Sequence, residues 1–366
     1  MQGRTFPKLA MAIRFAELYP PVPGGERTVP GFLLVVAAIV LLPLPVLAFG
    51  PIVHLDLGLD LLGSAGLMAA GVSRLLRRHP ESFLRGTLDP DRSLAKNLAS
   101  YCNHSHNWTH AFRQVRQARD EVERAAFLGY LCHLAADTVA HNGFVPSRIV
   151  EAWRNPVAGH LYWEMRADAR VRRRSGASLM WLVRPEDPAH REFLRRTVRP
   201  SLPGRRLQVR LTGLALKIQR GNAYGSATDL LDRRSSLLLD GDEINRAWTL
   251  ALAAQKQVLE ELDDAGISAI DPRGIAALKH AREVRRELRS MSIRGASPQQ
   301  VSGRIDAARM HFLGLVSTGL DLACAESAGA AGHCPSDGMP PEAARSDLEC
   351  SDAGLTAVSR AAIMSR

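Results

Sequence analysis

The chain has 366 residues, of which 46% are hydrophobic, so it can bury a full core in one large or two ordinary domains. Forty-seven basic and 37 acidic residues give a formal net charge of +10. This charge favours anionic partners such as phospholipid head groups or nucleic acid, but it does not choose between them. The five cysteines show no CxxC spacing, which argues against a cysteine-based metal site.

The first predicted element is a leader. Residues 31–48 form the only long apolar run, and two prolines interrupt it before it reaches the roughly 20 apolar residues that a membrane-spanning helix needs. Val46 and Ala48 lie at the third and first positions before a possible cut, the small-residue pattern that a signal peptidase prefers, so cleavage there would leave Phe49 as the first residue. We therefore expect an exported protein, periplasmic or secreted. The alternative is that residues 31–48 are retained as a membrane anchor.

Helical patterns follow the leader. Apolar residues recur at helical spacing over 56–76, and a turn then places Asp91 at a helix start. Residues 111–141 predict one long helix that is almost wholly apolar in its second half, which is typical of a central helix. The chain is expected to turn at the Asn-Gly pair that follows. The next helix is predicted over 157–173, with His160 in its first turn.

The remaining sequence also favours helices, and no alternating strand pattern is sustained. Helical runs are predicted at 242–263, 273–291 and 298–320. From about residue 325 the chain contains mostly Ala, Gly, Ser, Pro and Asp, which predicts a disordered tail. The sequence therefore indicates an all-α protein.

Histidine placement is the most informative feature, because eight of the 12 histidines fall between His54 and His160. In HLAADTVAH, the side chains of His133, Asp137 and His141 are spaced by four and four residues. At about 100° per residue they lie along one helix face. The pair His160 and Glu164 repeats this spacing on the next predicted helix, and such side chains offer ligands at the roughly 2.0–2.2 Å that zinc requires.

The alternative for these residues is a hydrogen-bonded buried cluster without metal. However, His133, Asp137 and His141 lie in a very apolar helix, where burying three unpaired polar groups would cost several kcal/mol. Metal ligation removes that cost. With a second histidine-carboxylate pair following on the next helix, the sequence favours a metal centre.

Five motifs make the pattern more specific. They are, in chain order, FGPIVH, GTLDPD, HNW, GYLCHLAADTVAHNGFVP and GHLYWEMRAD. In these motifs, which cover about residues 49–170, the chain resembles the zinc-dependent phospholipase C family, which shares its helical fold and three-zinc site with fungal single-strand nucleases. The resemblance implies a helical bundle with a metal cluster at its centre, plus additional C-terminal helices. We recognise no resemblance beyond residue 170.

The resemblance implies side-chain ligands for about three zinc ions. The first ion is expected on two histidines and two carboxylates: His106, His133, Asp91 and Asp137. Asp137 is also expected to bridge to another ion. The second, more separate ion is expected on His141, His160 and Glu164. The spacing between Asp137 and His141 is shorter here than in the secreted phospholipases.

The third ion is expected to bind His54 together with the amino and carbonyl groups of the mature first residue, Phe49. The best-known members of the family have tryptophan at this position. Because the implied ligands are backbone atoms, the replacement by phenylalanine affects packing more than coordination. This arrangement requires cleavage after Ala48, since only a free amine binds zinc well.

The resemblance also separates the ligands from their polar neighbours. The HNW motif assigns the ligand to His106, and the PD pair assigns it to Asp91. Nearby polar residues are expected in supporting or surface positions: His104 and His110 behind the ligands or at the surface, Asp89 in a turn or helix cap, and Asp168 either orienting a ligand imidazole or on the solvated surface.

The resemblance implies a zinc-dependent phosphoric ester hydrolase in which zinc activates a water molecule. Asp91 is expected to bind zinc, to accept the proton of the water, or to do both. The expected substrates are phospholipid head groups. A nuclease or nucleotidase is the nearest alternative, but few aromatic residues near the motifs are available to stack a base. A membrane-attached zinc-binding protein with little turnover is the other alternative.

The expected organisation has four parts. They are a leader at 1–48, a zinc-dependent phospholipase C-like domain at 49–185, a helical C-terminal extension at 186–324 and a tail at 325–366. The oligomeric state and the function of the extension do not follow from the sequence.

Overall fold

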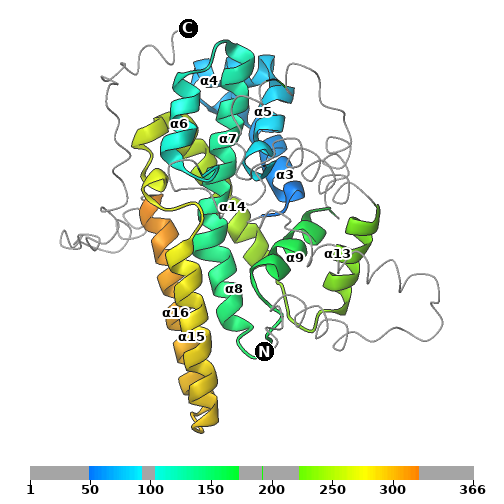
Figure 1. Cartoon of the computed structure of the whole chain (residues 1–366), viewed down its shortest axis with the longest axis vertical. Helices are drawn as coiled ribbons and strands as arrows, with labels where there is room; N and C mark the ends of the chain where they lie inside the picture. Colours follow the sequence, from blue (N-terminus) through cyan, green and yellow to red (C-terminus); the bar gives the residue numbers. More distant parts are fainter. Residues whose placement is uncertain (1–48, 93–103, 173–191, 193–221, 321–366) are drawn as a thin grey trace, which may run out of the picture.

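The computed structural model describes residues 49–92, 104–172, 192 and 222–320, and every regular element among them is a helix (Figure 1). The predicted all-α fold is confirmed. The leader at 1–48, the tail at 325–366 and most of the segment 173–221 lie outside the described residues. Within the described ranges, no helix is both long enough and apolar enough to cross a bilayer.

The N-terminal half of the described chain contains short helices around one long helix. In chain order they are α3 (Pro51–Gly63), η1 (Ala65–Leu67), α4 (Ala70–Arg78), α5 (Pro80–Gly86), η2 (Asp89–Arg92), α6 (Trp108–Arg116), α7 (Glu121–Val139), the π-helical turn η5 (Ala140–Phe144), α8 (Val145–Glu151) and α9 (His160–Arg172). The C-terminal half contains α13 (Asn222–Arg234), α14 (Gly241–Glu261), η6 (Leu262–Asp264), η7 (Gly266–Ala269), α15 (Ile275–Ile293) and α16 (Pro298–Gly319).

Helix α7 is the centre of the fold. Every residue from Ala125 to Val139 is buried, which explains why the second half of this helix is apolar on all sides. Helices α5, α6 and α14 pack around it. Helix α5 crosses very closely, because a Cβ atom at Gly86 would lie 1.9 Å from the carbonyl oxygen of Ala126 and one at Gly129 would lie 2.1 Å from that of Phe83. The two glycines therefore let the backbones meet.

Two local predictions were wrong. The expected single helix over 111–141 is divided into α6 and α7, because the Asp120 side chain accepts the Glu123 N–H at 2.8 Å and starts a new helix. The chain also does not turn at the Asn-Gly pair. The Asn142 side chain donates to the carbonyl oxygen of Thr138 at 2.9 Å, one turn back, and η5 leads directly into α8. The turn comes after Glu151 instead.

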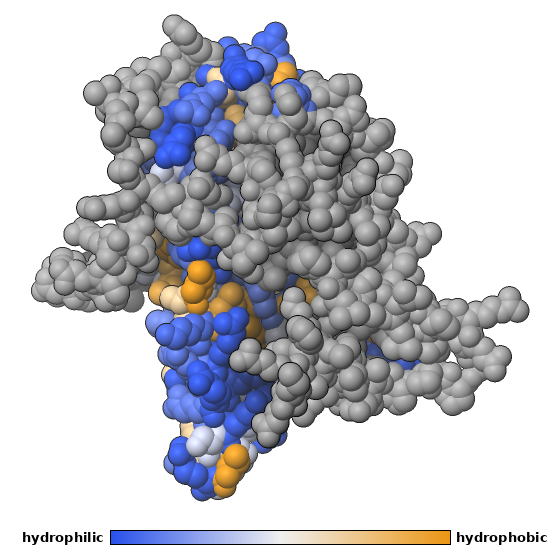
Figure 2. All heavy atoms as spheres, viewed as in Figure 1, coloured by the Kyte–Doolittle hydropathy of each residue, from blue (hydrophilic) through white to orange (hydrophobic). Residues whose placement is uncertain are grey.

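The three C-terminal helices agree with the predicted runs to within about two residues. Helix α14 packs against α7, whereas α15 and α16 pack against α8 and η5. One hydrophobic core therefore includes side chains from α3 to α16. Helices α15 and α16 form a hairpin whose far end projects from the bundle, and the visible surface of that end is mostly hydrophilic (Figures 1 and 2).

Candidate metal centre

Three groups of side chains in the described chain bring metal-ligating atoms within 4.8 Å of one another. The groups are His54, Asp91 and His133; His106, His133 and Asp137; and His141, His160 and Glu164. They contain all eight side chains that the sequence predicted as ligands. The bundle thus gathers, around α7, residues that are up to 110 positions apart, such as His54 and Glu164.

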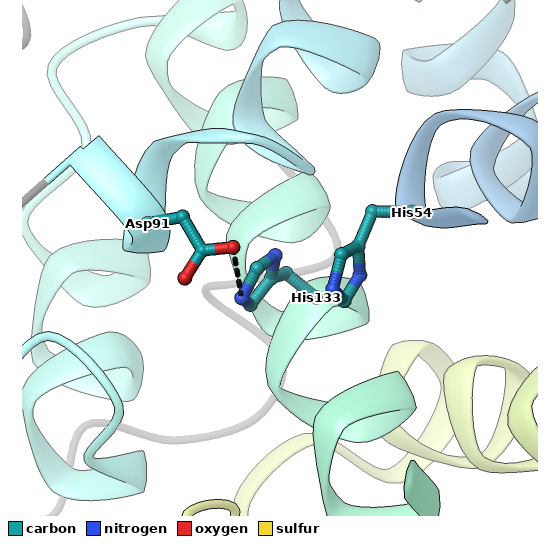
Figure 3. A group of neighbouring side chains, drawn as sticks. All are labelled: His54, Asp91 and His133. Carbon is teal, nitrogen blue, oxygen red and sulfur yellow. Dashed lines mark ion pairs between the residues drawn. The ribbon is translucent and has the colours of Figure 1, made fainter. Parts of the chain in front are cut away.

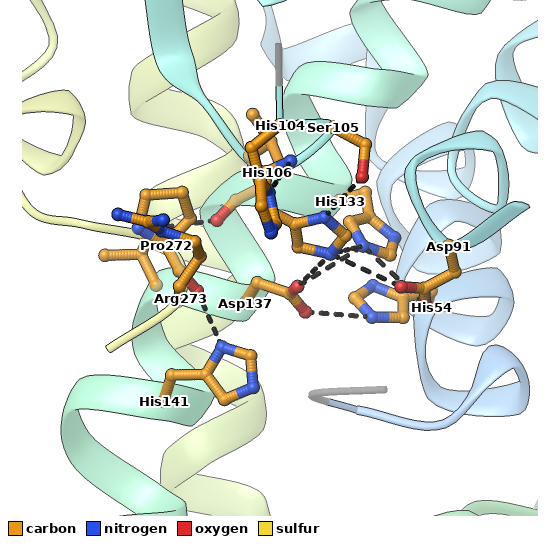
Figure 4. A network of polar contacts seen from close by, with 12 residues as sticks. His54, Asp91, His104, Ser105, His106, His133, Asp137, His141, Pro272 and Arg273 are labelled. Atoms are coloured by element: carbon orange, nitrogen blue, oxygen red, sulfur yellow. Dashed lines mark hydrogen bonds and ion pairs between the residues drawn. The ribbon is translucent and has the colours of Figure 1, made fainter. Parts of the chain in front are cut away.

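Asp137 lies at the middle of the first two groups (Figure 4). Its Oδ2 atom is 3.0 Å from Nε2 of His106 and 3.3 Å from Nε2 of His133. Its other oxygen, Oδ1, is 3.1 Å from Nε2 of His54. The two carboxylate oxygens therefore face different histidines, which is the arrangement required of a carboxylate that bridges two ions.

The spacing between ligand atoms suits a small tetrahedral cation. Two atoms that bind one zinc ion at 2.0–2.2 Å lie about 3.3–3.6 Å apart in a tetrahedral site. The Nε2 atoms of His106 and His133 are 3.2 Å apart, and each is at a similar distance from Oδ2 of Asp137. These three atoms therefore surround a volume of the size that zinc occupies.

Backbone contacts fix the ring of His133. Its Nδ1 atom lies 2.8 Å from the carbonyl oxygen of Thr87, which can only accept, so Nδ1 carries the proton and Nε2 offers its lone pair to the centre. Burial opposes protonation of His133, but the nearby carboxylates of Asp137 and Asp91 outweigh burial and raise the pKa of the imidazole. The same carboxylates attract a divalent cation.

His54 enters from α3 and Asp91 enters from η2 (Figure 3). The His54 ring stacks on the His133 ring with 3.8 Å between centroids, and burial lowers the pKa of His54. Asp91 places Oδ1 at 3.3 Å from Nε2 of His106 and Oδ2 at 3.8 Å from Nε2 of His133. Its side chain is 11% exposed, whereas that of Asp137 is fully buried, so Asp91 is the carboxylate of this pair that reaches solvent.

The third group lies on η5 and α9. The Nε2 atom of His160 is 2.7 Å from Oε1 of Glu164, and Nε2 of His141 is 3.9 Å from the same oxygen. Burial raises the pKa of Glu164 to about 8, because the charged carboxylate has lost its water. Nδ1 of His141 donates to the carbonyl oxygen of Pro272 at 2.6 Å, which again leaves Nε2 free to bind an ion.

Unsatisfied buried atoms show that these residues fit a metal. Both ring nitrogens of His54, both oxygens of Asp137, Nε2 of His141 and both oxygens of Glu164 are buried without a well-formed hydrogen bond. Proteins rarely leave buried polar atoms in this condition, because desolvation costs several kcal/mol per group. Nitrogen and oxygen donors in this arrangement match the ligand preference of zinc.

The start of the described chain packs against the same centre. The buried ring of Phe49 lies 6.2 Å from the His54 ring and 5.9 Å from the Phe144 ring, centroid to centroid. Asp168 from α9 accepts the N–H of Val53 at 3.2 Å and caps α3 one residue before His54. Asp168 is fully buried, so the alternative of a solvated surface position was wrong.

Several polar neighbours are more buried than a surface position would allow. His104 and His110 are both buried, and Nδ1 of His104 accepts the N–H of His106 at 2.9 Å. Ser105, which the sequence did not single out, places its hydroxyl 3.1 Å from Nδ1 of His106. Its position inside the HSHNW segment was the available signal. The contact between His141 and Pro272 could not be predicted from the sequence, because its acceptor is a backbone carbonyl.

The described chain is an all-helical bundle whose centre brings together histidine and carboxylate side chains that could hold metal ions. Residues 53–205 match the family described as zinc dependent phospholipase C. The matched residues include all eight predicted side-chain ligands. The family supports zinc-dependent phosphodiester hydrolysis and implies a phospholipid substrate. No curated protein and no solved structure matches the chain.

Proposed function

We propose that the protein is a phospholipase C-like hydrolase that uses about three zinc ions to cleave phospholipid head groups. The observation that carries this proposal is the position of Asp137, whose oxygens face His54 on one side and His106 with His133 on the other. A single tetrahedral ion cannot use eight side chains as ligands, so the three groups support more than one ion.

The proposed ligands of the second ion are those of the third group, and the side chains of the first two groups are divided between the first and third ions. The first ion would be held by His106, His133, Asp91 and Asp137, with Asp137 shared. The second ion would be held by His141, His160 and Glu164. For the third ion we propose His54 with the backbone amino and carbonyl groups of Phe49, and the contact between His54 and Asp137 supports placing this ion next to the first.

The side chains around the first ion have distinct tasks. When bound, zinc lowers the pKa of a water molecule from about 15.7 towards about 7 and neutralises negative charge on a phosphoryl group. Thr87 keeps His133 in the tautomer whose Nε2 can bind an ion. Asp91 reaches solvent, so it can accept the proton released by the attacking water at a point where the proton can leave.

The structure supports a lipid substrate over a nucleic acid. Base stacking requires exposed aromatic rings, and the candidates near the motifs were few. All of them are buried, with 1–8% of each residue exposed: Trp108, Trp153, Tyr162 and Trp163. Within the described residues these rings serve the core, which leaves a nuclease or nucleotidase as the weaker alternative.

We also propose that the mature protein acts outside the cytoplasm, either periplasmic or secreted. Export with cleavage after Ala48 would produce the free amine of Phe49 that the third ion requires. If residues 31–48 were retained, the protein would be anchored to a membrane, and a zinc-binding role with little turnover would become the better explanation. Contact with a membrane surface is expected in either case, because the substrate is a lipid.

The test is an activity panel with purified protein beginning at Phe49. Phospholipids with different head groups, single-stranded nucleic acid and a generic phosphodiester should be compared, each with and without a zinc chelator. We expect release of phosphorylated head groups that stops with chelator and returns with zinc. Preferential cleavage of nucleic acid would support the nuclease alternative, and no turnover of any substrate would support the binding role.

A further inference from the structure

A loop outside the family match contacts the third group, which is the proposed site of the second ion. Residues 270–274, here called the 270–274 loop, precede α15 and lie beyond residue 205. The carbonyl oxygen of Pro272 accepts Nδ1–H of His141 at 2.6 Å, and that of Asp271 accepts the side-chain N–H of the adjacent Asn142 at 2.9 Å. The carbonyl oxygen of Ile270 accepts Nε1–H of Trp108 at 2.9 Å. Three successive carbonyls of the loop thus hold side chains of the N-terminal half, and Figure 4 shows the one at Pro272 beside His141.

The backbone of this loop lies directly against His141. Gly274 has φ +55°, and a Cβ atom added there would be 2.4 Å from the carbonyl oxygen of His141 and 2.5 Å from its Cβ. Only glycine allows both this conformation and this approach. Asp271 stabilises the loop from within, since its Oδ1 accepts the backbone N–H of Arg273 at 3.2 Å and Nε–H of the same residue at 3.0 Å.

Helix α15 also holds the segment that leads to His160. The Arg285 guanidinium donates to the carbonyl oxygens of Trp153 at 3.3 Å, Ala158 at 3.5 Å and Asn155. These carbonyls belong to the connection between α8 and α9, and His160 is the first residue of α9. The positions of both histidines of the third group therefore depend on α15 and the loop before it.

We propose that the 270–274 loop and Arg285 are positioning elements of the second zinc site. The Pro272 carbonyl would keep the His141 ring in the tautomer and direction that zinc binding needs, and Arg285 would fix the start of α9. This inference rests on the proposed function, because it takes the third group as the site of the second zinc ion. It means that the C-terminal helices help to build the metal centre. It also predicts that residues 49–205 alone cannot bind the second ion.

Gly274→Ala in the full-length mature chain is the direct test, because it pushes the loop away from His141 without removing a ligand. Gly295→Ala is the matched control, since Gly295 also has a positive φ, +77°, and no atom within 4 Å of an added Cβ. Zinc per chain should be measured by elemental analysis, and zinc affinity by competition with a chromophoric chelator. We expect Gly274→Ala to lower the affinity for the second zinc ion by about 10–100-fold, which is the usual effect of losing a hydrogen bond that orients a metal ligand. Gly295→Ala should bind zinc as the unmodified protein does.

A second pair of variants covers the case in which Gly274→Ala fails to fold. Arg285→Ala should lower the affinity for the same zinc ion, whereas Arg286→Ala should leave it unchanged. Exposed Arg286 donates within α15, to the carbonyl oxygen of Arg282 at 3.4 Å. Unchanged zinc affinity in Gly274→Ala, or in Arg285→Ala should the glycine variant not fold, would overturn the inference. If the unmodified protein bound no zinc, the proposed function itself would fail, and the two failures are therefore distinguishable.

Discussion

His54 and Asp137 join the first helix of the described chain to its central helix. Nε2 of His54 lies 3.1 Å from Oδ1 of Asp137, and both side chains are fully buried. The other oxygen of Asp137 lies near His106 and His133, so this one carboxylate contacts three of the histidines in the three groups. Its loss should therefore affect more than one ion.

We predict that Asp137→Asn lowers zinc content more than Glu164→Gln does. An amide keeps the size of each side chain but removes the negative charge, and Asp137 is proposed to hold two ions whereas Glu164 holds one. Elemental analysis of both variants should show a larger zinc loss for Asp137→Asn, with circular dichroism confirming helical content. Equal losses of metal and activity in the two variants would contradict a bridging role for Asp137.

Zinc affinity at the third group, the proposed site of the second ion, should depend on pH because of Glu164. Burial raises the pKa of this carboxyl to about 8 when no ion is bound, so below that pH zinc must displace a proton. The apparent affinity should therefore fall up to about tenfold for each pH unit below about 8 and level off above it. Chelator competition between about pH 7 and 9 measures this slope. Glu164→Gln, which has no proton to release there, should bind more weakly and with a shallower slope; an equal slope would show that Glu164 is not the titrating group.

Asp168 should matter for stability even though it is not a proposed ligand. Its carboxylate caps α3 beside His54 and lies so close to Gly50 that an added Cβ there would be 1.8 Å from Oδ2. Asp168→Ala should lower the free energy of unfolding of the metal-free protein by about 1–3 kcal/mol, measured by urea denaturation. Asp120→Ala removes an exposed cap of α7 and should cost about 1 kcal/mol. An Asp168→Ala variant as stable as the unmodified protein would contradict this capping role.

A free amino group at Phe49 should be needed for the third ion. Phe49 is buried against His54, so the residue that cleavage after Ala48 would make the first lies at the centre, and a neutral amine binds zinc whereas a peptide nitrogen does not. Protein with one extra residue before Phe49 should lose about one zinc and most of its turnover while keeping its helical content. Full zinc content and unchanged turnover in the extended form would rule out ligation by the terminus.

The sequence predicted the parts of the site that depend on helical spacing. His133 with Asp137, and His160 with Glu164, are each one turn apart, so their shared direction follows from the helix itself. Asp91 lies in the short helix η2, and His106 lies just before α6. Helical spacing cannot relate either residue to α7, so only the family resemblance identified them as ligands. The Pro272 carbonyl, 131 residues from His141, could not be predicted because any residue supplies the same acceptor.

The break between α6 and α7 shows a second limit. Residues 117–120 contain no proline or glycine, so the apolar pattern continued through them. A new helix begins there because the Asp120 side chain accepts the backbone N–H of Glu123 and caps α7. In the other direction, the Asn-Gly pair after His141 resembled a turn, but tertiary contacts to Asp271 hold Asn142 within η5.

Zinc stoichiometry is the most direct test of a multinuclear centre. Protein beginning at Phe49 should be purified after zinc-replete expression, freed of loosely bound metal by dialysis, and measured by elemental analysis against its concentration from amino-acid analysis. The account predicts about two to three zinc ions per chain, because eight ligand side chains in three groups exceed the capacity of one tetrahedral ion. One zinc ion per chain, or none, would contradict it.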